Sequence, residues 1–206
     1  MAKIYLYTCI VLLYVGCIDS PIHGDIAPNK IPKEVIEVVQ PEPEIEPYKR
    51  IVPIAKSFVG IKEVGGNNQG FSDLSYQRRL ERIGWKRGQS WCSYAVMATL
   101  DSAGIKHKIT GWSPTSFNKK NVVYTDGEFQ KDFREGDVFS LTYQKFKNDK
   151  TRYKGIGHTG IVEKIIDNGR NVQTYEGNVD GTSGRDGNGY HRKIRPINKS
   201  LHITRW

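Results

Sequence analysis

The sequence predicts an α+β domain in which N-terminal helices pack on a central antiparallel β-sheet. Apolar residues recur at helical spacing between positions 48 and 104. From position 137 onward, short segments rich in β-branched and aromatic residues alternate with glycine- and asparagine-rich turns. Helices first and strands afterwards are typical of an α+β domain with an antiparallel sheet.

Two helices are expected before position 84. The first begins near Tyr48 and ends at Gly60, and the apolar residues on one of its faces are Ile51, Ile54, Ala55, Phe58 and Val59. Residues 65–70 are glycine and asparagine with one glutamine, which predicts a turn-rich loop. The second helix is expected over 72–83, with inward positions at Leu74, Leu80 and Ile83.

The third expected helix follows the only cysteine of the domain. Residues 93–100 are a good helix-forming run that stops around Gly104. This places Cys92 in the first turn of the helix. Backbone N–H groups and the helix dipole both stabilise a thiolate there, so Cys92 is a candidate nucleophile. A small buried side chain without chemistry is the alternative.

Five strands are expected after a loop over 110–121. They cover residues 137–142, 159–166, 172–176, 190–194 and 201–204. The turn signal Asp167-Asn168-Gly169 predicts that the second and third strands form an antiparallel hairpin.

The first 48 residues differ in composition from the rest. Lys3 and the thirteen-residue apolar run 4–16 are typical of a secretion signal, because a span of the bilayer needs roughly 20 residues. Gly16-Cys17 at the end of the run resembles the lipidation site of bacterial lipoproteins, so residues 1–17 predict a signal peptide and a lipid anchor on Cys17. Simple signal-peptide cleavage is the alternative. We expect an exported protein of the periplasm or cell envelope, anchored to a bacterial membrane.

The proline- and glutamate-rich residues 18–48 predict an extended tether, which leaves residues 49–206 as the domain. The domain carries the positive charge of the chain. Residues 48–206 hold 28 basic and 15 acidic residues, a net charge of +13 against +9 for the whole chain. Such a surface favours polyanions, or is simply a solvated basic surface. Nucleic acid is disfavoured as a partner, because no aromatic–basic binding motif is present and the N-terminus indicates export.

A nucleophilic cysteine needs a base and a group that orients the base. Of the five histidines, His158 opens a β-rich segment between two glycines, which leave room for a substrate backbone. Glu176 and Asn178 lie two residues apart, so they share one face of a strand, and either could accept a hydrogen bond from the imidazole. The expected hairpin brings His158 near Glu176. A structural histidine and a turn acid and amide are the alternatives.

Residues 50–206 resemble a CHAP domain, the amidase and endopeptidase branch of the papain-like peptidoglycan hydrolases. The order and spacing of five motifs carry the resemblance: Val59-Gly60-Ile61-Lys62-Glu63 with Gly66-Asn67-Asn68; Trp91-Cys92-Ser93; Glu135-Gly136-Asp137-Val138; Gly157-His158-Thr159-Gly160-Ile161-Val162; and Glu176-Gly177-Asn178. One departure is Ser93, where many members have alanine or glycine.

The resemblance implies a papain-like fold and a thiol mechanism with Cys92 as nucleophile, His158 as base, Glu176 as orienting acid and Asn178 as accessory residue. It also implies that Glu63, Asn67 and Asn68 border a cleft, where they contact substrate or form a turn. Trp91 is expected to pack beside Cys92 and to contact substrate. The expected partner is peptidoglycan, cut at a stem-peptide or cross-bridge amide by a monomer that needs no cofactor or metal.

Three alternatives stay open. Thiolate, imidazole and carboxylate are all acceptable zinc ligands, so Cys92, His158 and Glu176 could hold a metal. A non-catalytic wall-binding or scaffolding module could share the fold. A thiol amidase could also act on a protein, or against competing cells, rather than on the wall of its own cell.

Overall fold

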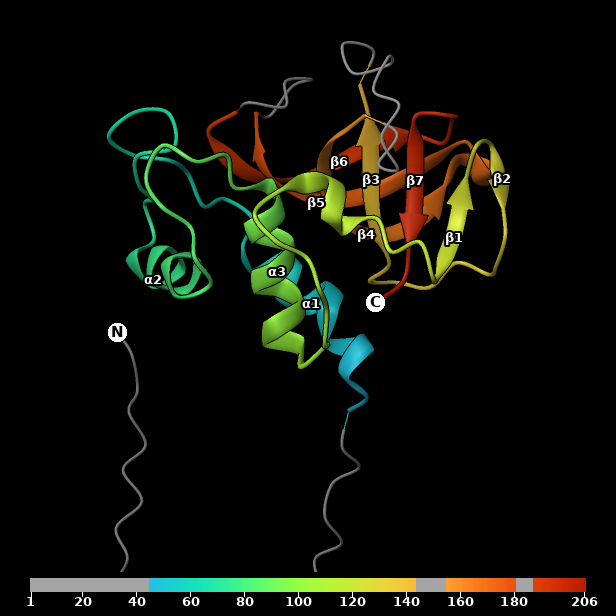
Figure 1. Ribbon diagram of the computed structural model, residues 1–206, viewed down its shortest axis with the longest axis horizontal. Helices are drawn as coiled ribbons and strands as arrows, with labels where there is room; N and C mark the ends of the chain where they lie inside the picture. The colour runs from blue at the N-terminus through green and yellow to red at the C-terminus, as the bar shows by residue number, and fades with distance from the viewer. Residues whose placement is uncertain (1–44, 144–154, 181–186) are drawn as a thin grey trace, which may run out of the picture. The chain divides into compact units, whose positions relative to one another are not determined.

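The computed structural model describes residues 45–143, 155–180 and 187–206 (Figure 1). The expected signal peptide, the lipidation of Cys17 and nearly all of the tether lie outside the described residues. Within the described part of the chain, no helix combines the length and apolar character needed to cross a membrane.

Three α-helices and two 3-10 turns precede the sheet. They are η1 (Pro47–Arg50), α1 (Ile51–Ser57), α2 (Leu74–Arg82), α3 (Cys92–Ala103) and η2 (Ser113–Ser116). Asp73 begins α2, because its carboxylate accepts from the backbone N–H groups of Ser75 and Tyr76. Gly104 ends α3 in the left-handed conformation, with φ of 79°, which a glycine adopts without steric cost. All three expected helices are therefore present.

Two apolar residues expected on inward helical faces are exposed instead. Leu74 at the start of α2 is 63% exposed and Val59 is 44% exposed. In α2 the buried face is formed by Tyr76 and Leu80, four residues apart. The expectation for Leu74 and Val59 is wrong because Leu74 is the first residue of α2 and Val59 lies two residues beyond the end of α1.

The strands form one seven-stranded sheet. They are β1 (Val122–Thr125), β2 (Glu128–Phe129), β3 (Val138–Thr142), β4 (Ile156–Ile166), β5 (Asn171–Val179), β6 (Gly189–Pro196) and β7 (Leu201–Thr204), in the order β2-β1-β7-β3-β4-β5-β6. Every neighbouring pair is antiparallel. The mixed helical and antiparallel-sheet class is confirmed. The hairpin of β4 and β5 through η4 (Asp167–Gly169) is confirmed as well.

Strands β1 and β2 were not expected from the sequence. Both are short, and β2 is exposed at both of its residues. Asp126-Gly127, the turn between them, has positive φ at both residues, 56° and 98°. Asp-Gly is a typical signal for a two-residue hairpin, so the sequence did contain a signal for this turn.

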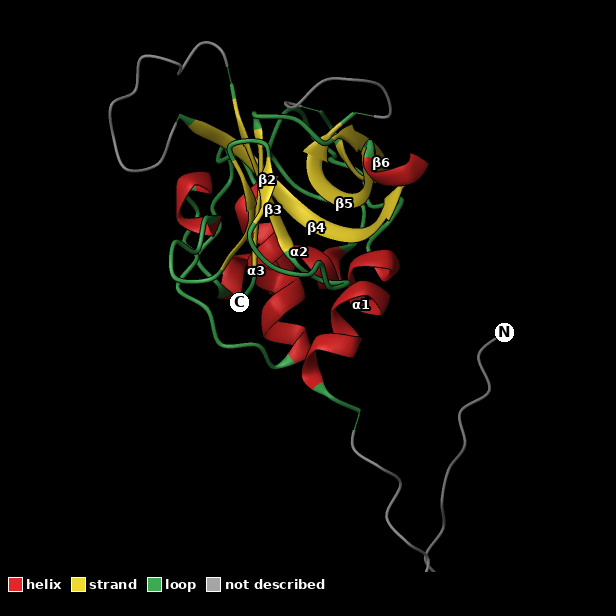
Figure 2. Cartoon of the chain, turned by 90° about the vertical axis from the view of Figure 1, so that its right-hand side faces the viewer, coloured by secondary structure: helices red, strands yellow, loops and turns green. Residues whose placement is uncertain are grey.

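Helix α3 packs against β4 and β5, and α1 packs against α3 on the same side of the sheet (Figures 1 and 2). The contact of α3 with β5 is very close at Gly177, where a Cβ atom would lie 2.4 Å from the Trp91 ring and 2.7 Å from Ala95 Cβ. Only glycine fits there. This close contact sets the start of α3 beside the residues of β4 and β5 that carry the expected chemistry.

Candidate active site

Cys92 is the first residue of α3 and is 7% exposed. Trp91 precedes it as the N-cap and makes no side-chain capping hydrogen bond. The N–H groups of the first helical turn have no partner within the helix, so they point their positive end toward the start of α3. The sulfur therefore lies where a thiolate, and later an oxyanion, is favoured.

Trp91 fixes the start of α3 through its contacts with Glu63 and Phe71. Its indole Nε1 donates to Glu63 Oε1 at 2.6 Å, and the backbone N–H of Asn68 donates to Glu63 Oε2 at 2.7 Å. The ring packs edge-on against Phe71 with centroids 4.9 Å apart. Trp91 is fully buried next to Cys92, so the packing expected of it is confirmed, while no part of it is exposed for the expected contact with substrate. It positions Cys92 instead.

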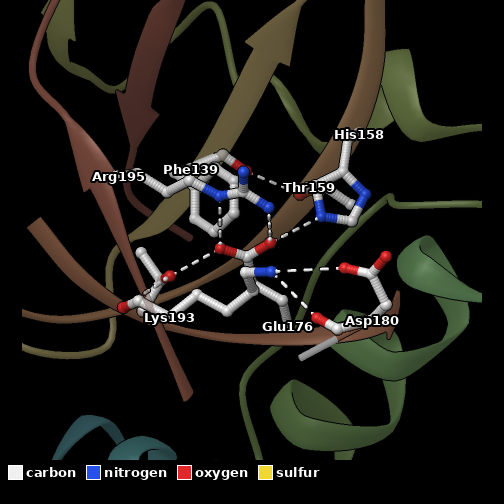
Figure 3. A network of polar contacts seen from close by, with 8 residues as sticks. Phe139, His158, Thr159, Glu176, Asp180, Lys193 and Arg195 are labelled. Carbon is white, nitrogen blue, oxygen red and sulfur yellow. Dashed lines mark hydrogen bonds and ion pairs between the residues drawn. The ribbon is translucent and has the colours of Figure 1, made fainter. Parts of the chain in front are cut away.

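His158 is the third residue of β4, which begins at Ile156, three residues before the start expected at Thr159. Its Nε2 is 2.9 Å from Glu176 Oε2 of β5 (Figure 3). The two residues are 1% and 0% exposed. The hairpin register pairs Ile161 with Tyr175, so both side chains lie near the same end of the paired strands. The expected proximity of His158 and Glu176 is confirmed.

Two residues that sequence reasoning missed hold the Glu176 carboxylate. Arg195 of β6 donates from Nε to Oε1 at 2.8 Å and from Nη2 to Oε2 at 2.6 Å (Figure 3). Thr174 Oγ1 also donates to Oε1 at 2.6 Å. Burial would raise the pKa of Glu176, but the hydrogen bonds and charges of Arg195 and His158 outweigh burial and lower this pKa to about 2. Glu176 is therefore ionised at neutral pH.

The alternation of side chains along a β-strand could have indicated that Thr174 lies beside Glu176 and Arg195 on the same face of the sheet. Thr174 and Glu176 share one face of β5, and Arg195 pairs with Val172 of the same face. However, His191 is the residue directly opposite Glu176. The Arg195 guanidinium, four residue pairs away along the strands, reaches the carboxylate only because its side chain is long, and a sequence pattern does not encode that reach.

The pKa of His158 responds to both of its neighbours. Burial would lower this pKa, but hydrogen bonds to Cys92 and Glu176, together with their negative charges, raise it to about 9. Since Nε2 bonds Glu176, Nδ1 is the nitrogen left for the thiol. At neutral pH the imidazole is a cation between the Cys92 sulfur and the Glu176 carboxylate, and Arg195 balances the charge of the carboxylate.

Asn178 lies in a bulge of β5 and has φ of 61°. Its side chain is buried, and its Oδ1 has no hydrogen-bond partner among the described residues. Its backbone carbonyl accepts from Gly187 N at 3.3 Å. The accessory role expected for Asn178 therefore stays a prediction, while its position two residues beyond Glu176 places it next to the polar network.

The loop that begins at Glu63 lines an open pocket of about 320 Å³. Its other lining residues are Val64, Gly65, Gly66, Asn67, Gly187 and Asn188. Glu63 and Asn67 thus lie where a ligand can reach them, and Glu63 connects this pocket to Trp91 and the active-site helix. Asn68 is only 6% exposed, with φ of 58°, and is a turn residue rather than a pocket-lining one.

The donors around Glu176 bear on the zinc alternative. Both of its carboxylate oxygens already accept from Arg195, and a cationic donor at this place opposes a metal cation. In the described ranges, no group of three or more His, Cys, Asp or Glu residues is arranged to hold a metal ion.

Comparison of the chain with protein-family models, curated proteins and solved structures gave no match.

Proposed function

We propose that this protein is an exported peptidoglycan amidase or endopeptidase of the papain-like, CHAP type. One observation carries the proposal: His158 bonds Glu176 through Nε2 and interacts with Cys92, the first residue of a helix. A thiolate at a helix start, an imidazolium beside it and a buried carboxylate behind the imidazole are the parts of a thiol hydrolase.

The reaction begins with attack of the Cys92 thiolate on an amide carbonyl carbon. A tetrahedral oxyanion forms, and N–H groups of the first turn of α3, that of Cys92 among them, stabilise it. His158 donates its proton to the departing amine as the C–N bond breaks, which leaves a thioester. His158 then takes a proton from water, the hydroxide attacks the thioester, and the C–S bond breaks to return the thiolate and release an acid.

Each supporting residue has a share in this cycle. Glu176 keeps the imidazole oriented and stabilises its cationic form, while Arg195 and Thr174 keep Glu176 ionised and in place. Loss of the orienting carboxylate in the serine triad lowers kcat by about 10⁴-fold. Trp91 and Glu63 hold the helix that carries the sulfur.

Peptidoglycan is the proposed substrate for three reasons. The N-terminal residues have the pattern of an export signal with a lipidation cysteine, and the domain is basic, as suits an acidic wall polymer. The order of the Trp-Cys, Gly-Asp-Val, Gly-His and Glu-Gly-Asn motifs is similar to that of CHAP peptidoglycan hydrolases. Both the sugar–peptide amide and the peptide bonds of the stem and cross-bridge have the required carbonyl and leaving amine.

The test uses the full-length protein on purified peptidoglycan, with fragments identified by mass spectrometry. Cys92→Ala and His158→Ala are each expected to lower fragment release by at least about 10³-fold. The control is His191→Ala, a half-buried histidine of β6 outside the triad, which is expected to keep activity. Iodoacetamide should abolish activity and a chelator should not.

Full activity of either Cys92→Ala or His158→Ala would refute the thiol mechanism. Loss of activity to the chelator alone would favour the zinc alternative. Wild-type protein that binds peptidoglycan tightly and releases no fragment would identify a wall-binding module instead.

A further inference from the structure

A second concave site lies at the other end of α3 from Cys92. It has a volume of about 400 Å³ and its lining comes from three separate parts of the chain: residues 106–108 after α3, residues 117–120 after η2, and the last residue, Trp206. The twelve-residue helix is about 18 Å long, so this second site is separate from the active site. We call it the basic groove.

Four lysines line the basic groove: Lys106, Lys108, Lys119 and Lys120. All four are exposed. Among the described residues, no carboxylate forms an ion pair with Lys106, Lys108 or Lys120. Positive charges gathered around one hollow repel one another, and an anionic ligand relieves that repulsion.

One acidic side chain beside the groove, Asp101, is already engaged. Asp101 of α3 bonds His107 Nε2 at 3.1 Å, and its side chain is 50% exposed while that of His107 is 7% exposed. His107 Nδ1 accepts from the backbone N–H of Ile109 at 3.2 Å. Asp101 therefore fixes the segment that carries Lys106 and Lys108, rather than neutralising them.

The groove also has an aromatic wall. Trp206 is partly exposed, and its Nε1 donates to the carbonyl of Ser116 at 3.1 Å, which fixes the indole against the η2 segment. The His107 ring lies edge-on to the indole, with centroids 6.3 Å apart. Phe117 contributes a buried ring below. A fixed ring face beside ammonium groups suits a ligand with both apolar C–H faces and negative charge.

We propose that this basic groove binds an anionic polysaccharide, a chain of sugars that carry carboxylate or phosphate groups. The indole packs on the C–H face of one sugar ring, and the lysine pairs 106/108 and 119/120 bind acidic groups on neighbouring sugars. A concave site suits an extended polymer better than a flat lipid surface. Single-stranded nucleic acid stacks its successive bases on several aromatic rings, whereas Trp206 is the one aromatic ring of the groove lining that is not buried.

Binding of a polysaccharide is a function beyond the proposed hydrolysis. The groove would hold the polymer about one helix length from the Cys92 sulfur. Cys92 then acts on wall segments close to the bound chain. The binding itself does not require Cys92, so it can be tested in a protein without the nucleophile.

The experiment measures binding of alginate, a polymer of uronic acids, and of neutral dextran by titration calorimetry. All proteins are full-length and carry Cys92→Ala. The groove variant replaces Lys106, Lys108, Lys119 and Lys120 by glutamine. The matched control replaces four exposed lysines elsewhere: Lys56, Lys86, Lys164 and Lys199. Both sets change the net charge equally, and circular dichroism checks that each folds.

The parent protein is expected to bind alginate and not dextran. Since each exposed charge contact is worth up to about 1 kcal/mol, the groove variant should bind alginate at least about tenfold more weakly, and the control within about twofold of the parent. Trp206→Leu keeps all four lysines. It should weaken alginate binding without changing the dependence of the affinity on salt concentration.

Three results would overturn the proposal. The first is absence of alginate binding by the parent. The second is an equal loss in the groove variant and the control, which would mean that net charge alone binds the polymer. The third is that the groove substitutions abolish binding to phosphatidylglycerol vesicles or to a single-stranded oligonucleotide while alginate binding stays unchanged. The outcome of the peptidoglycan digestion assay affects none of these readings.

Discussion

Replacing Arg195 by methionine would leave Glu176 as a buried carboxylate without its guanidinium. The two groups are joined at 2.8 and 2.6 Å, and the Glu176 side chain is 0% exposed. Methionine keeps much of the length of the arginine side chain and lacks its charge. His158 would remain as the nearest cationic partner, and Thr174 would remain as the neutral donor.

The expected loss of stability follows from the pKa of Glu176. Burial would raise this pKa, yet Arg195 and His158 lower it from 4.5 to about 2. That difference corresponds to about 3 kcal/mol of folding free energy at neutral pH. Breaking a buried pair by removal of one partner costs about 3–5 kcal/mol, so Arg195→Met should lower the free energy of unfolding by about 3 kcal/mol.

Urea unfolding at pH 7 measures this loss, and Arg192→Met is the matched control. Arg192 precedes Arg195 on the same strand and pairs with Glu163 at 2.7 Å, but its side chain is 43% exposed. A pair this exposed contributes at most about 1 kcal/mol. An Arg195→Met loss no greater than that of Arg192→Met would refute the buried-clamp interpretation.

Acidification gives a second check with a definite sign. Because the folded pKa of Glu176 is lowered, its contribution is present above pH 4.5 and is lost as the pH falls through about 2. The stability difference between wild type and Arg195→Met should therefore narrow as the pH falls from 4.5 toward 2. A constant difference over this range would contradict the assignment.

Two further predictions concern the active-site residues around the start of α3. The pKa of His158 is about 9, because Cys92 and Glu176 outweigh the effect of burial. The NMR signals of its ring protons should therefore titrate with a midpoint near pH 9, and Glu176→Gln should lower that midpoint. A wild-type midpoint at or below pH 6.5 would contradict this prediction. The stability that the imidazolium contributes is fully present below pH 6.5 and is lost as the pH rises through about 9. Gly177→Ala would place a Cβ 2.4 Å from the Trp91 ring, so the free energy of unfolding, measured by urea titration, should fall by about 1–3 kcal/mol. An unchanged value would mean that β5 and α3 separate freely at this contact.

Local sequence patterns predicted most of the elements. Helical spacing located α1, α2 and α3, and the glycine that ends α3 was readable at position 104. Short β-rich runs located β3 to β7, although β4 and β5 extend further than expected. The errors lie where a local pattern is weakest: two short strands at the sheet edge, and apolar residues at helix ends that are exposed.

For the candidate site, the sequence predicted the residues with chemistry better than those that support them. His158 and Glu176 were expected to meet through a hairpin, and they do. Arg195 was not expected. Trp91 packs beside Cys92 as expected, but it was also assigned a contact with substrate, and the fold buries it against Phe71. Supporting residues are chosen by packing and register across several strands, which leave no periodic signal in one stretch of sequence.

The sequence by itself determined that Cys92 begins a helix and that a Gly-His strand and a Glu-Gly-Asn strand form a hairpin, because turn chemistry and residue periodicity act over a few neighbouring residues. The tertiary structure alone decided that β6 supplies the guanidinium for Glu176, that Glu63 holds the tryptophan before the nucleophile, and that the four lysines of residues 106–120 meet the distant C-terminal tryptophan. Those contacts join residues far apart in the chain, and they exist only after the sheet register and the packing of α3 have brought their elements together.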